Sequence, residues 1–416
     1  MSRPSATIDK IALTANPFFM AGVLLLSLVP QETGQVVSPI MANIMQAFPH
    51  NSPATLSYIM TLPALATCIF AIVCGRLSVT ISSKKLALFG LSAYIVGGST
   101  CGLIENAYWM IGCRALLGIG SGFCLPLTQG LIAEYYEGAK RASMMGYAQA
   151  IGCIGGAAIS LAAGYIALIS WRNVFLLYLF PVVVLVMIAR MLPHTKLTSP
   201  LAGMVKNSEK TLDDKRNIGL GVYVFAAVGF ITMANVAGLM INLSPVIRAR
   251  HLGDSSNAGI ALAVMSLWSG VAAGFFGWVF KFFKEHIITM GLILFALTNI
   301  MVAKASSIFT IYAAASAWGI AAGLSLPCLG MLVSALAKDA YKSFALAILT
   351  SSLNLGVFAA SLAMGILFTT LGAGNYNAYF GNTAILFAGL AVAMGIYVTG
   401  LRVSVARSLR PEGVRP

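Results

Sequence analysis

The sequence predicts an all-α membrane protein in which twelve transmembrane helices form two six-helix bundles related by pseudo-symmetry. Three observations predict this fold class: a strongly apolar composition, apolar runs of spanning length, and one fixed offset that relates the two halves. Of the 416 residues, 59% are hydrophobic and only 9% are charged, and the mean hydropathy is +0.88. Because soluble domains carry about a quarter charged residues, this composition indicates a chain that crosses the membrane many times.

The apolar runs have the length and number of a polytopic helical protein. Runs such as "NVFLLYLFPVVVLVMIA" exclude a β-barrel, because a spanning helix needs about 20 apolar residues whereas barrel strands are short and alternating. The expected spans are residues 17–47, 55–78, 86–104, 107–133, 143–168, 172–191, 218–247, 257–280, 287–304, 307–336, 343–371 and 379–401. We expect two domains, 1–193 and 218–416, joined by a polar linker at 194–217.

A repeat relates the two halves. The motif "GIGSGFCLP" begins at Gly118, and "GIAAGLSLP" begins 201 residues later at Gly319. The same offset relates Pro126 to Pro327 and Gly164 to Gly365. Since each half contains an even number of spans, the two halves are parallel in topology. Parallel halves that rock around a central site are the architecture of a class of secondary transporters.

The basic residues predict the orientation in the membrane. The net charge is +14, and alternate loops place 21 of the 26 lysines and arginines on one side. The positive-inside rule then puts both termini and the linker in the cytoplasm, in a multi-pass protein of the cell (inner) membrane. Topology and anionic headgroups explain this charge, so we expect membrane lipids as partners and no nucleic acid.

Several functional classes lack support in the sequence. The seven cysteines lie inside predicted spans without a CxxC pair, so we expect free thiols and no metal site. No Walker lysine follows the glycine-rich runs, which argues against ATP as the energy source. The few histidines and acids are scattered among loops, so we expect no enzyme and no cofactor. A six-plus-six chain encloses its own passage, so we expect it to function as a monomer.

Two motifs carry a family resemblance. Span four contains "GCRALLGIGSG", in which Arg114 precedes Gly118 by four residues, and "GRLSVTISSKK" joins spans two and three. On these motifs the chain resembles the major facilitator superfamily over essentially its whole length. The resemblance implies alternating access, a passage lined by spans one, four, seven and ten, and a gating loop that includes Gly75, Lys84 and Lys85.

The resemblance narrows further in span five. The segment "GCIGGAAISLAAGYIALISWRNVF" is similar to the 12-helix drug/proton antiporter branch in its glycine run and its Trp171-Arg172 ending. The chain departs from the family patterns at three positions. Val79 and Ser82 replace the aspartate and a glycine of the signature loop, and Ser160 lies roughly where the antiporter branch has a proline.

Glu32 is the one carboxylate that the sequence places deep in a span. The other eleven acidic residues fall in loops, at span ends or in the tails. At about 1.5 Å per residue, Glu32 lies about 15 Å below the outer surface, at a depth similar to that of Arg114. We expect Glu32 and Arg114 to couple transport to protons, because desolvation favours a neutral carboxyl group and a nearby guanidinium favours a charged one. Two alternatives stay open: a purely structural pair, or direct contact of Glu32 with substrate.

Polar and large apolar side chains at helical spacing predict the substrate cavity. The candidates are Gln31, Gln35, Ser121, Thr128, Thr232, Met233, Asn235, Asn242, Trp318, Ser351 and Asn354. For the asparagines the alternative is an interhelical hydrogen bond. Met233, Trp268 and Trp318 also suit an aromatic and thioether pocket for a flat lipophilic substrate, or else core or lipid-facing packing.

The sequence therefore predicts a secondary active transporter of a small molecule, with the proton gradient as its energy source. The first hypothesis is proton-coupled export of lipophilic neutral or cationic molecules, which the embedded acid and the span-five resemblance favour. The alternatives are a proton-coupled importer of a small polar nutrient and an uncoupled lipid transporter. Gene deletion separates the first two, since loss of an exporter sensitises cells to dyes and loss of an importer prevents growth on one nutrient.

Overall fold

The computed structural model describes residues 17–78, 80–192, 219–337, 341–371 and 375–408, and all of its regular elements are helices. The first half contains α2 (Pro17–Leu26), α3 (Leu28–Gln35), η1 (Ser38–Ile40), α4 (Met41–Ala47), α5 (Pro53–Leu77), α6 (Ser83–Ser99), η2 (Thr100–Gly102), α7 (Ala107–Tyr135), α8 (Gly138–Ile169), η3 (Trp171–Leu179) and α9 (Pro181–Met191). The second contains α11 (Leu220–Ala249), α12 (Ser255–Phe283), η5 (Lys284–His286), α13 (Ile287–Ala303), α14 (Ile308–Leu336), α15 (Lys342–Leu371) and α16 (Tyr376–Ser408).

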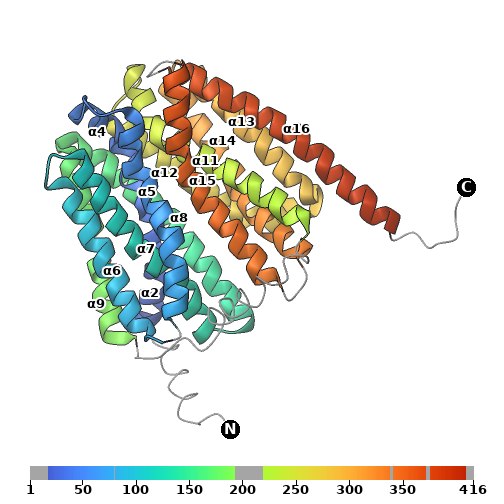
Figure 1. The fold of residues 1–416 in the computed structure, drawn as a ribbon, viewed down its shortest axis with the longest axis horizontal. Helices are drawn as coiled ribbons and strands as arrows, with labels where there is room; N and C mark the ends of the chain where they lie inside the picture. The colour runs from blue at the N-terminus through green and yellow to red at the C-terminus, as the bar shows by residue number, and fades with distance from the viewer. Residues whose placement is uncertain (1–16, 79, 193–218, 338–340, 372–374, 409–416) are drawn as a thin grey trace, which may run out of the picture.

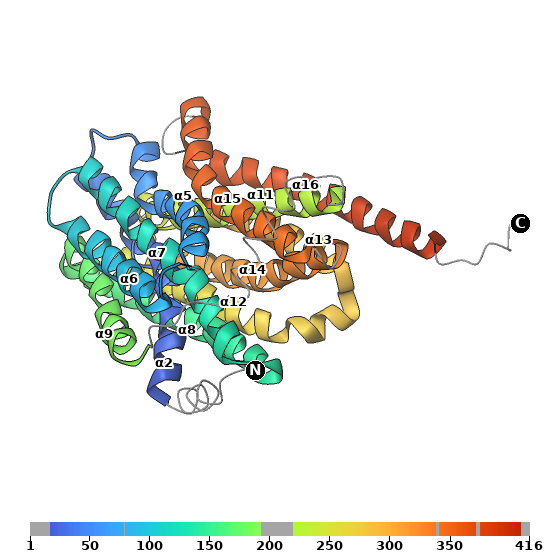
Figure 2. The ribbon, with the colours of Figure 1, turned by 60° about the horizontal axis from the view of Figure 1, so that its bottom comes forward.

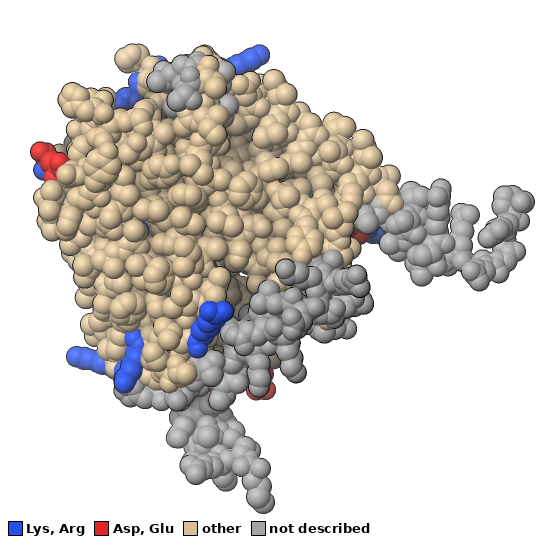
Figure 3. Space-filling model, viewed as in Figure 1, with Lys and Arg blue, Asp and Glu red and all other residues tan. Residues whose placement is uncertain are grey.

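Each predicted span corresponds to a helix or to a run of shorter helices, so the predicted fold class is confirmed. Within the described ranges, nine helical stretches are long and apolar enough to cross a membrane, and one of these runs through both α12 and α13. On the face shown in Figure 3, charged side chains gather mainly at the ends of the molecule, with an uncharged band between. The predicted linker at 194–217 lies outside the described residues, so the domain boundaries stay a prediction.

The first span is broken, which corrects the expectation of one continuous helix over residues 17–47. It consists of α2, α3, η1 and α4 in succession. Two prolines explain the breaks, because a proline has no N–H to donate four residues back. Pro30 leaves the Leu26 carbonyl without its helical donor, and Pro39 does the same for Gln35. The break at η1 falls where the first span meets α11 and α12 of the second half, whereas the break between α2 and α3 lies against α8 of the first half.

The helices of the first half and those of the second half form two bundles. The two bundles meet at one end of the molecule and diverge toward the other. Figure 1 shows α5 beside α15 toward its upper end, with α4 nearby, and Figure 2 again shows α5 beside α15. The most extensive contacts between the groups join α8 to α12 and α5 to α15. We call the end that carries the loop at residues 48–52 the closed end. The opposite end carries the α5–α6 turn and the start of the described part of α2.

Small residues allow the close approach at the closed end. A Cβ atom added to Gly164 of α8 would lie 2.7 Å from the Ser255 carbonyl oxygen of α12, and one on Gly365 of α15 would lie 3.2 Å from the Ala54 Cβ. Gly164 and Gly365 are the residues that the 201-residue offset relates. Each bundle therefore brings the same small residue to its contact with the other bundle, as membrane helices use small residues for close packing.

Candidate functional site

A cavity of about 690 Å³ lies between the two bundles. This volume is in the range of sites for drug-sized molecules. The cavity is lined by α3, α5, α7 and α8 from the first half and by α11, α12, α14 and α15 from the second. Its described lining residues include glutamine, asparagine, serine and threonine side chains but no charged side chain. The wall therefore suits an uncharged or weakly polar molecule better than an anion.

Hydrogen bonds between the bundles gather at the closed end. Thr61 of α5 and Ser361 of α15 share a hydrogen bond of 2.5 Å, and Ser255 donates to Asn43 Oδ1 at 2.6 Å. Ser244 of α11 donates to the Pro39 carbonyl at 2.7 Å, and Ser38 donates to the Met240 carbonyl. Together with the glycine contacts, these bonds seal one end of the cavity, so the structure represents a state that is closed on one side.

Gln35 joins both bundles from within the cavity wall. It ends α3 and is half-buried. Its Oε1 accepts a 2.5 Å hydrogen bond from Ser160 of α8, and its Nε2 donates to Ser266 Oγ of α12 at 3.1 Å. Ser160 lies roughly where the antiporter branch has a proline, and here its hydroxyl group holds the Gln35 side chain. Both ends of the Gln35 amide are partnered, one in each half of the chain.

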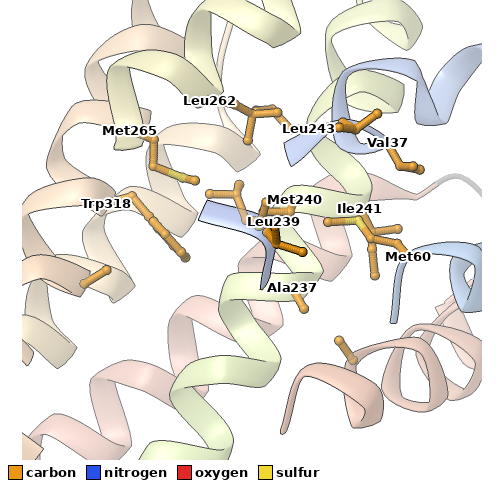
Figure 4. Packing of buried hydrophobic residues seen from close by; sticks show 14 of the residues in the cluster. Val37, Met60, Ala237, Leu239, Met240, Ile241, Leu243, Leu262, Met265 and Trp318 are labelled. Carbon is orange, nitrogen blue, oxygen red and sulfur yellow. The ribbon is translucent and has the colours of Figure 1, made fainter. Parts of the chain in front are cut away.

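Thioethers and one indole form the apolar part of the wall. Met60 and Met240, from opposite bundles, place their methyl groups over Gly34, at 3.5 and 3.3 Å from a Cβ atom added there. Met265 and Trp318 come from α12 and α14, and Figure 4 shows all four side chains among the buried residues of this region. Trp318 packs edge-on against Phe295, with centroids 5.4 Å apart. Such a surface adapts to aromatic and lipophilic ligands.

Arg114 is fully buried and ties three segments together. Its Nε donates to the Ile59 carbonyl of α5 at 2.7 Å, and Nη1 donates to the Tyr178 hydroxyl at 2.6 Å. Its Nη2 donates to the Thr33 carbonyl of α3, one residue from Glu32 along the chain. The guanidinium therefore reaches the segment that carries Glu32. The side chains of Glu32 and Gln31 lie outside the described residues, so the Glu32–Arg114 pair stays a prediction.

Five of the expected cavity residues line the cavity and five lie elsewhere. Those in the wall are Gln35, Ser121, Met233, Trp318 and Asn354. Those outside the wall in this conformation are Thr128, Thr232, Asn235, Asn242 and Ser351, so their role in a substrate cavity stays a prediction. Trp268 also lies elsewhere, 44% exposed on α12.

The physical reason is clearest on α11. The face toward the cavity carries Met233, Val236, Ala237 and Met240, at i, i+3, i+4 and i+7. Asn235 and Asn242 lie on neighbouring faces, where Asn235 Oδ1 and Asn242 Nδ2 are hydrogen-bonded inside the second bundle and Asn235 Nδ2 and Asn242 Oδ1 have no partner among the described residues. Asn299 Nδ2 donates to Asn235 Oδ1 at 3.2 Å.

Asn242 and Thr128 form hydrogen bonds within their own helices. Asn242 Nδ2 donates to the Gly238 carbonyl at 2.8 Å, and Thr128 donates to the Cys124 carbonyl at 2.9 Å. Buried polar groups are mostly hydrogen-bonded, and the Asn242 Nδ2 and Thr128 hydroxyl groups bond along the helix, away from the cavity. Asn235 and Asn242 are thus polar side chains of a span that form hydrogen bonds inside the bundle and do not line the cavity.

Other residues in the wall were missed by the sequence reasoning. Gln149 and Cys153 of α8, and Ser266 and Ser269 of α12, all line the cavity. The repeat held the signal for one of them, since Cys153 lies 201 residues before Asn354. The pairs Gln35/Val236 and Ser121/Ala322 have the same offset and also line the wall. Applying the offset to each candidate would have extended the predicted set.

A known family matches the chain in two segments, one in each half. Residues 19–217 and 225–415 match the sequence profile of the Major Facilitator Superfamily, which covers nearly all of the chain. The chain belongs to the Major Facilitator Superfamily. Members of this superfamily are transporters rather than enzymes, so the chain is a multi-pass membrane transporter with a small-molecule substrate.

Curated superfamily relatives are similar to the chain at low identity. YceJ of Bacillus subtilis, an uncharacterized transporter, is 23% identical over 90% of this chain and 95% of its own length. Multidrug resistance protein 3 of the same organism is 29% identical over 32% of this chain, which spans only 25% of that protein. Multidrug resistance protein MdtL of Shigella flexneri is 23% identical over 48% of this chain and 50% of its own.

Solved superfamily structures share the fold. An inward-facing, occupied bacterial homologue of the human lysosomal transporter Spinster matches with a TM-score of 0.71 and 15% identity, covering 92% of this chain and 97% of its own. A D-xylose–proton symporter matches with a TM-score of 0.68 and 15% identity, covering 90% and 96%. At such identity these matches show the fold alone.

The predicted gating loop lies at the end opposite the closed end. Gly75 is buried in the last turns of α5, and Lys84 and Lys85 lie in the first turn of α6. Val79, where the superfamily loop has an aspartate, lies outside the described residues. The gating role of Gly75, Lys84 and Lys85 therefore stays a prediction.

Proposed function

We propose that the chain is a proton-coupled exporter of lipophilic, neutral or cationic small molecules that works by alternating access. The observation that carries this proposal is the central cavity, sealed at one end and lined by uncharged described side chains from both bundles. A cavity between parallel halves becomes a transport path when the halves rock about it. The names of two relatives, Multidrug resistance protein 3 and MdtL, favour export of such molecules.

The chemistry of the wall supports a lipophilic substrate. Met60, Met233, Met240 and Met265 supply flexible, polarizable thioethers, and Trp318 supplies a flat aromatic face. These side chains bind molecules of varied shape, because methionine fills irregular gaps and contacts aromatic rings favourably. No described basic side chain lines the cavity, so a cationic substrate meets no repulsion from this wall.

In this proposal Glu32 and Arg114 couple transport to protons. Glu32 belongs to α3, and Arg114 donates to the carbonyl of the next residue, Thr33. When the bundles rock, the breaks around α3 allow this short helix to shift relative to α7. A change in distance or wetting between the carboxyl group and the guanidinium favours proton uptake on one side and release on the other. The energy source we propose is accordingly the proton gradient, without a cofactor.

The proposed setting is the inner membrane, with both termini and the linker in the cytoplasm. In that orientation the closed end faces outward, and the cavity receives substrate from the cytoplasm or the inner leaflet. The chain would work as a monomer, because eight helices of one chain already enclose the cavity.

One observation favours a second candidate, import of a small polar nutrient. The amides of Gln35, Gln149 and Asn354 line the wall and suit hydroxyl or carbonyl groups. An uncoupled lipid transporter is the third, since the wall is largely apolar. Gene deletion separates them: sensitivity to dyes supports export, failure to grow on one nutrient supports import, and an altered lipid distribution supports the third.

The test of the proposed function is transport by purified protein in proteoliposomes with an acidic interior. Proton efflux through the antiporter drives ethidium inward, so we expect accumulation well above that of protein-free liposomes. A protonophore should abolish this accumulation. Accumulation equal to that of protein-free liposomes, or unaffected by the protonophore, contradicts proton-coupled transport of cationic molecules.

A further inference from the structure

The hydrogen bond between Gln35 and Ser266 differs from the other bonds that join the bundles. Among the interbundle hydrogen bonds of the described residues, it is the one whose two side chains both line the cavity. Thr61 and Ser361, for example, are fully buried at the closed end and outside the wall. A molecule inside the cavity can therefore reach both side chains of the Gln35–Ser266 bond.

The Gln35 amide directs its oxygen to the first bundle and its nitrogen to the second. Ser160 donates to its Oε1 at 2.5 Å, which turns Nε2 toward Ser266 across the interface. Gln35 thus stays with α8 of its own half while its donor group holds the second half. When the two bundles separate at the closed end, the bond to Ser266 has to break and the bond to Ser160 need not.

Breaking that bond has a cost that a ligand is able to offset. Opening removes the protein partner of the part-buried Gln35 Nε2–H group, and the loss of one hydrogen bond is equivalent to about threefold to tenfold in an equilibrium constant. A bound molecule with a carbonyl, ether or aromatic nitrogen acceptor replaces Ser266 as the partner of Gln35 Nε2. Such a molecule lowers the cost of opening the closed end, and a molecule of the same shape without an acceptor does not.

We propose that Gln35 is a specificity-determining latch: an uncharged, lipophilic substrate with a hydrogen-bond acceptor takes the Nε2–H group that Ser266 holds and so releases the closed end. This inference rests on the proposed function, because it requires that substrate binds in this cavity. It narrows the substrate class from lipophilic molecules in general to those that carry an acceptor. It also couples substrate recognition to opening of the closed end, because the same Nε2–H group binds the substrate and releases Ser266.

The binding test uses two planar probes of matched shape, 9-fluorenone, which has a carbonyl acceptor, and fluorene, which has none. Equilibrium dialysis of the full chain in lipid nanodiscs gives both affinities, with empty nanodiscs as the correction for partitioning. In Ser266→Ala, Gln35 has no competing partner, so the affinity for fluorenone should rise about threefold to tenfold while that for fluorene stays unchanged. In Gln35→Met, the two probes should bind equally.

Ser269→Ala is the matched control, because Ser269 lines the same wall of α12 one turn further on. It should leave the ratio of the two affinities at the wild-type value, and fluorene binding confirms that each variant is folded. A Ser266→Ala ratio equal to that of wild type overturns the inference. So does a fluorenone preference that survives Gln35→Met, or a wild-type chain that does not bind fluorenone.

The opening test places a thiol at the closed end. In a chain whose native cysteines are replaced, Ser361→Cys puts a reactive group where the native side chain is fully buried. Fluorenone should raise the rate of maleimide labelling at least about threefold, and fluorene should not. Equal responses to both probes contradict the latch. Neither test uses a proton gradient, so absence of driven transport with an intact probe ratio would count against the proposed function alone.

Discussion

Gly164 of α8 and Gly259 of α12 bring the backbones of the two bundles into direct contact. A Cβ atom on Gly164 would lie 3.1 Å from the Gly259 Cα, and one on Gly259 would lie 2.5 Å from the Ser160 carbonyl oxygen. Ser160 is also the residue that holds Gln35. The glycine contact therefore sets the distance across which Gln35 reaches Ser266.

Substituting Gly259 should prevent the two bundles from meeting at the closed end. In Gly259→Leu the side chain meets backbone atoms that cannot move aside, and overpacking of this kind costs about 1–3 kcal/mol. We expect ethidium accumulation in proteoliposomes to fall about fivefold or more. Gly277→Leu, near the other end of α12 where a Cβ atom meets nothing within 4 Å, is the control and should transport normally. Equal activity of the two variants would show that this contact is not part of the cycle.

Replacing the embedded carboxyl group should uncouple transport from protons. Glu32→Gln keeps the size and polarity of the side chain but cannot exchange a proton. We expect gradient-driven ethidium accumulation to be lost while binding of fluorenone is retained. The matched control is Glu137→Gln, since Glu137 is exposed at the start of α8. Undiminished driven transport in Glu32→Gln would leave only a structural or substrate-contacting role.

Loss of Arg114 should destabilise the first bundle. Arg114→Met leaves the Ile59 and Thr33 carbonyls and the Tyr178 hydroxyl without their charged donor. Hydrogen bonds to a charged group contribute about 1.5–3 kcal/mol each, so we expect the unfolding free energy to fall by about 3 kcal/mol or more. Tyr178→Phe removes one of these partners and should cost about half as much, as measured by thermal unfolding in detergent. A stable Arg114→Met variant would contradict this account of the guanidinium.

The start of α12 makes a pH-dependent contribution to stability. Asp254 caps this helix, and its pKa lies below the ordinary value of 3.8, because the hydrogen bond from the Ser256 side chain, with those from the Ser256 and Asn257 backbone, outweighs the opposing effect of burial. A lowered pKa in the folded state means that the stabilisation is complete above pH 3.8 and is lost as the pH falls below it. Asp254→Ala should therefore cost about 1 kcal/mol at neutral pH. The difference from wild type in thermal unfolding should shrink in strong acid; a deficit that grows there contradicts the sign.

The fold could be predicted from the sequence because its signals are additive along the chain. Span length, breaks and the 201-residue offset each depend on many residues, so single irregularities do not alter the result. The interruption of the first span was also visible in Pro30 and Pro39. Its consequence was not, because a proline predicts a break but not where the following segment packs.

The site was only half predictable, for a reason that α11 makes plain. Met233, Val236, Ala237 and Met240 face the cavity, and one residue of register separates Met233 from Thr232. A rotation of about 100° thus decides which set lines the passage. The sequence patterns selected Met233 together with Thr232, Asn235 and Asn242, but the two asparagine amides form hydrogen bonds inside the second bundle. Gln35 was predicted as polar lining, and its role between Ser160 and Ser266 became visible only with three helices placed together.

Labelling of Cys153 from the two sides of the membrane tests the central claim most directly. This native cysteine lines the cavity, and the other six are replaced so that it alone reacts. A membrane-impermeant maleimide is applied to right-side-out or inverted vesicles, with and without fluorenone and a proton gradient. Alternating access predicts that Cys153 reacts from the cytoplasmic side in the resting state and becomes reactive from the opposite side when substrate and the gradient open the closed end. Reactivity from one side only under every condition would contradict the account.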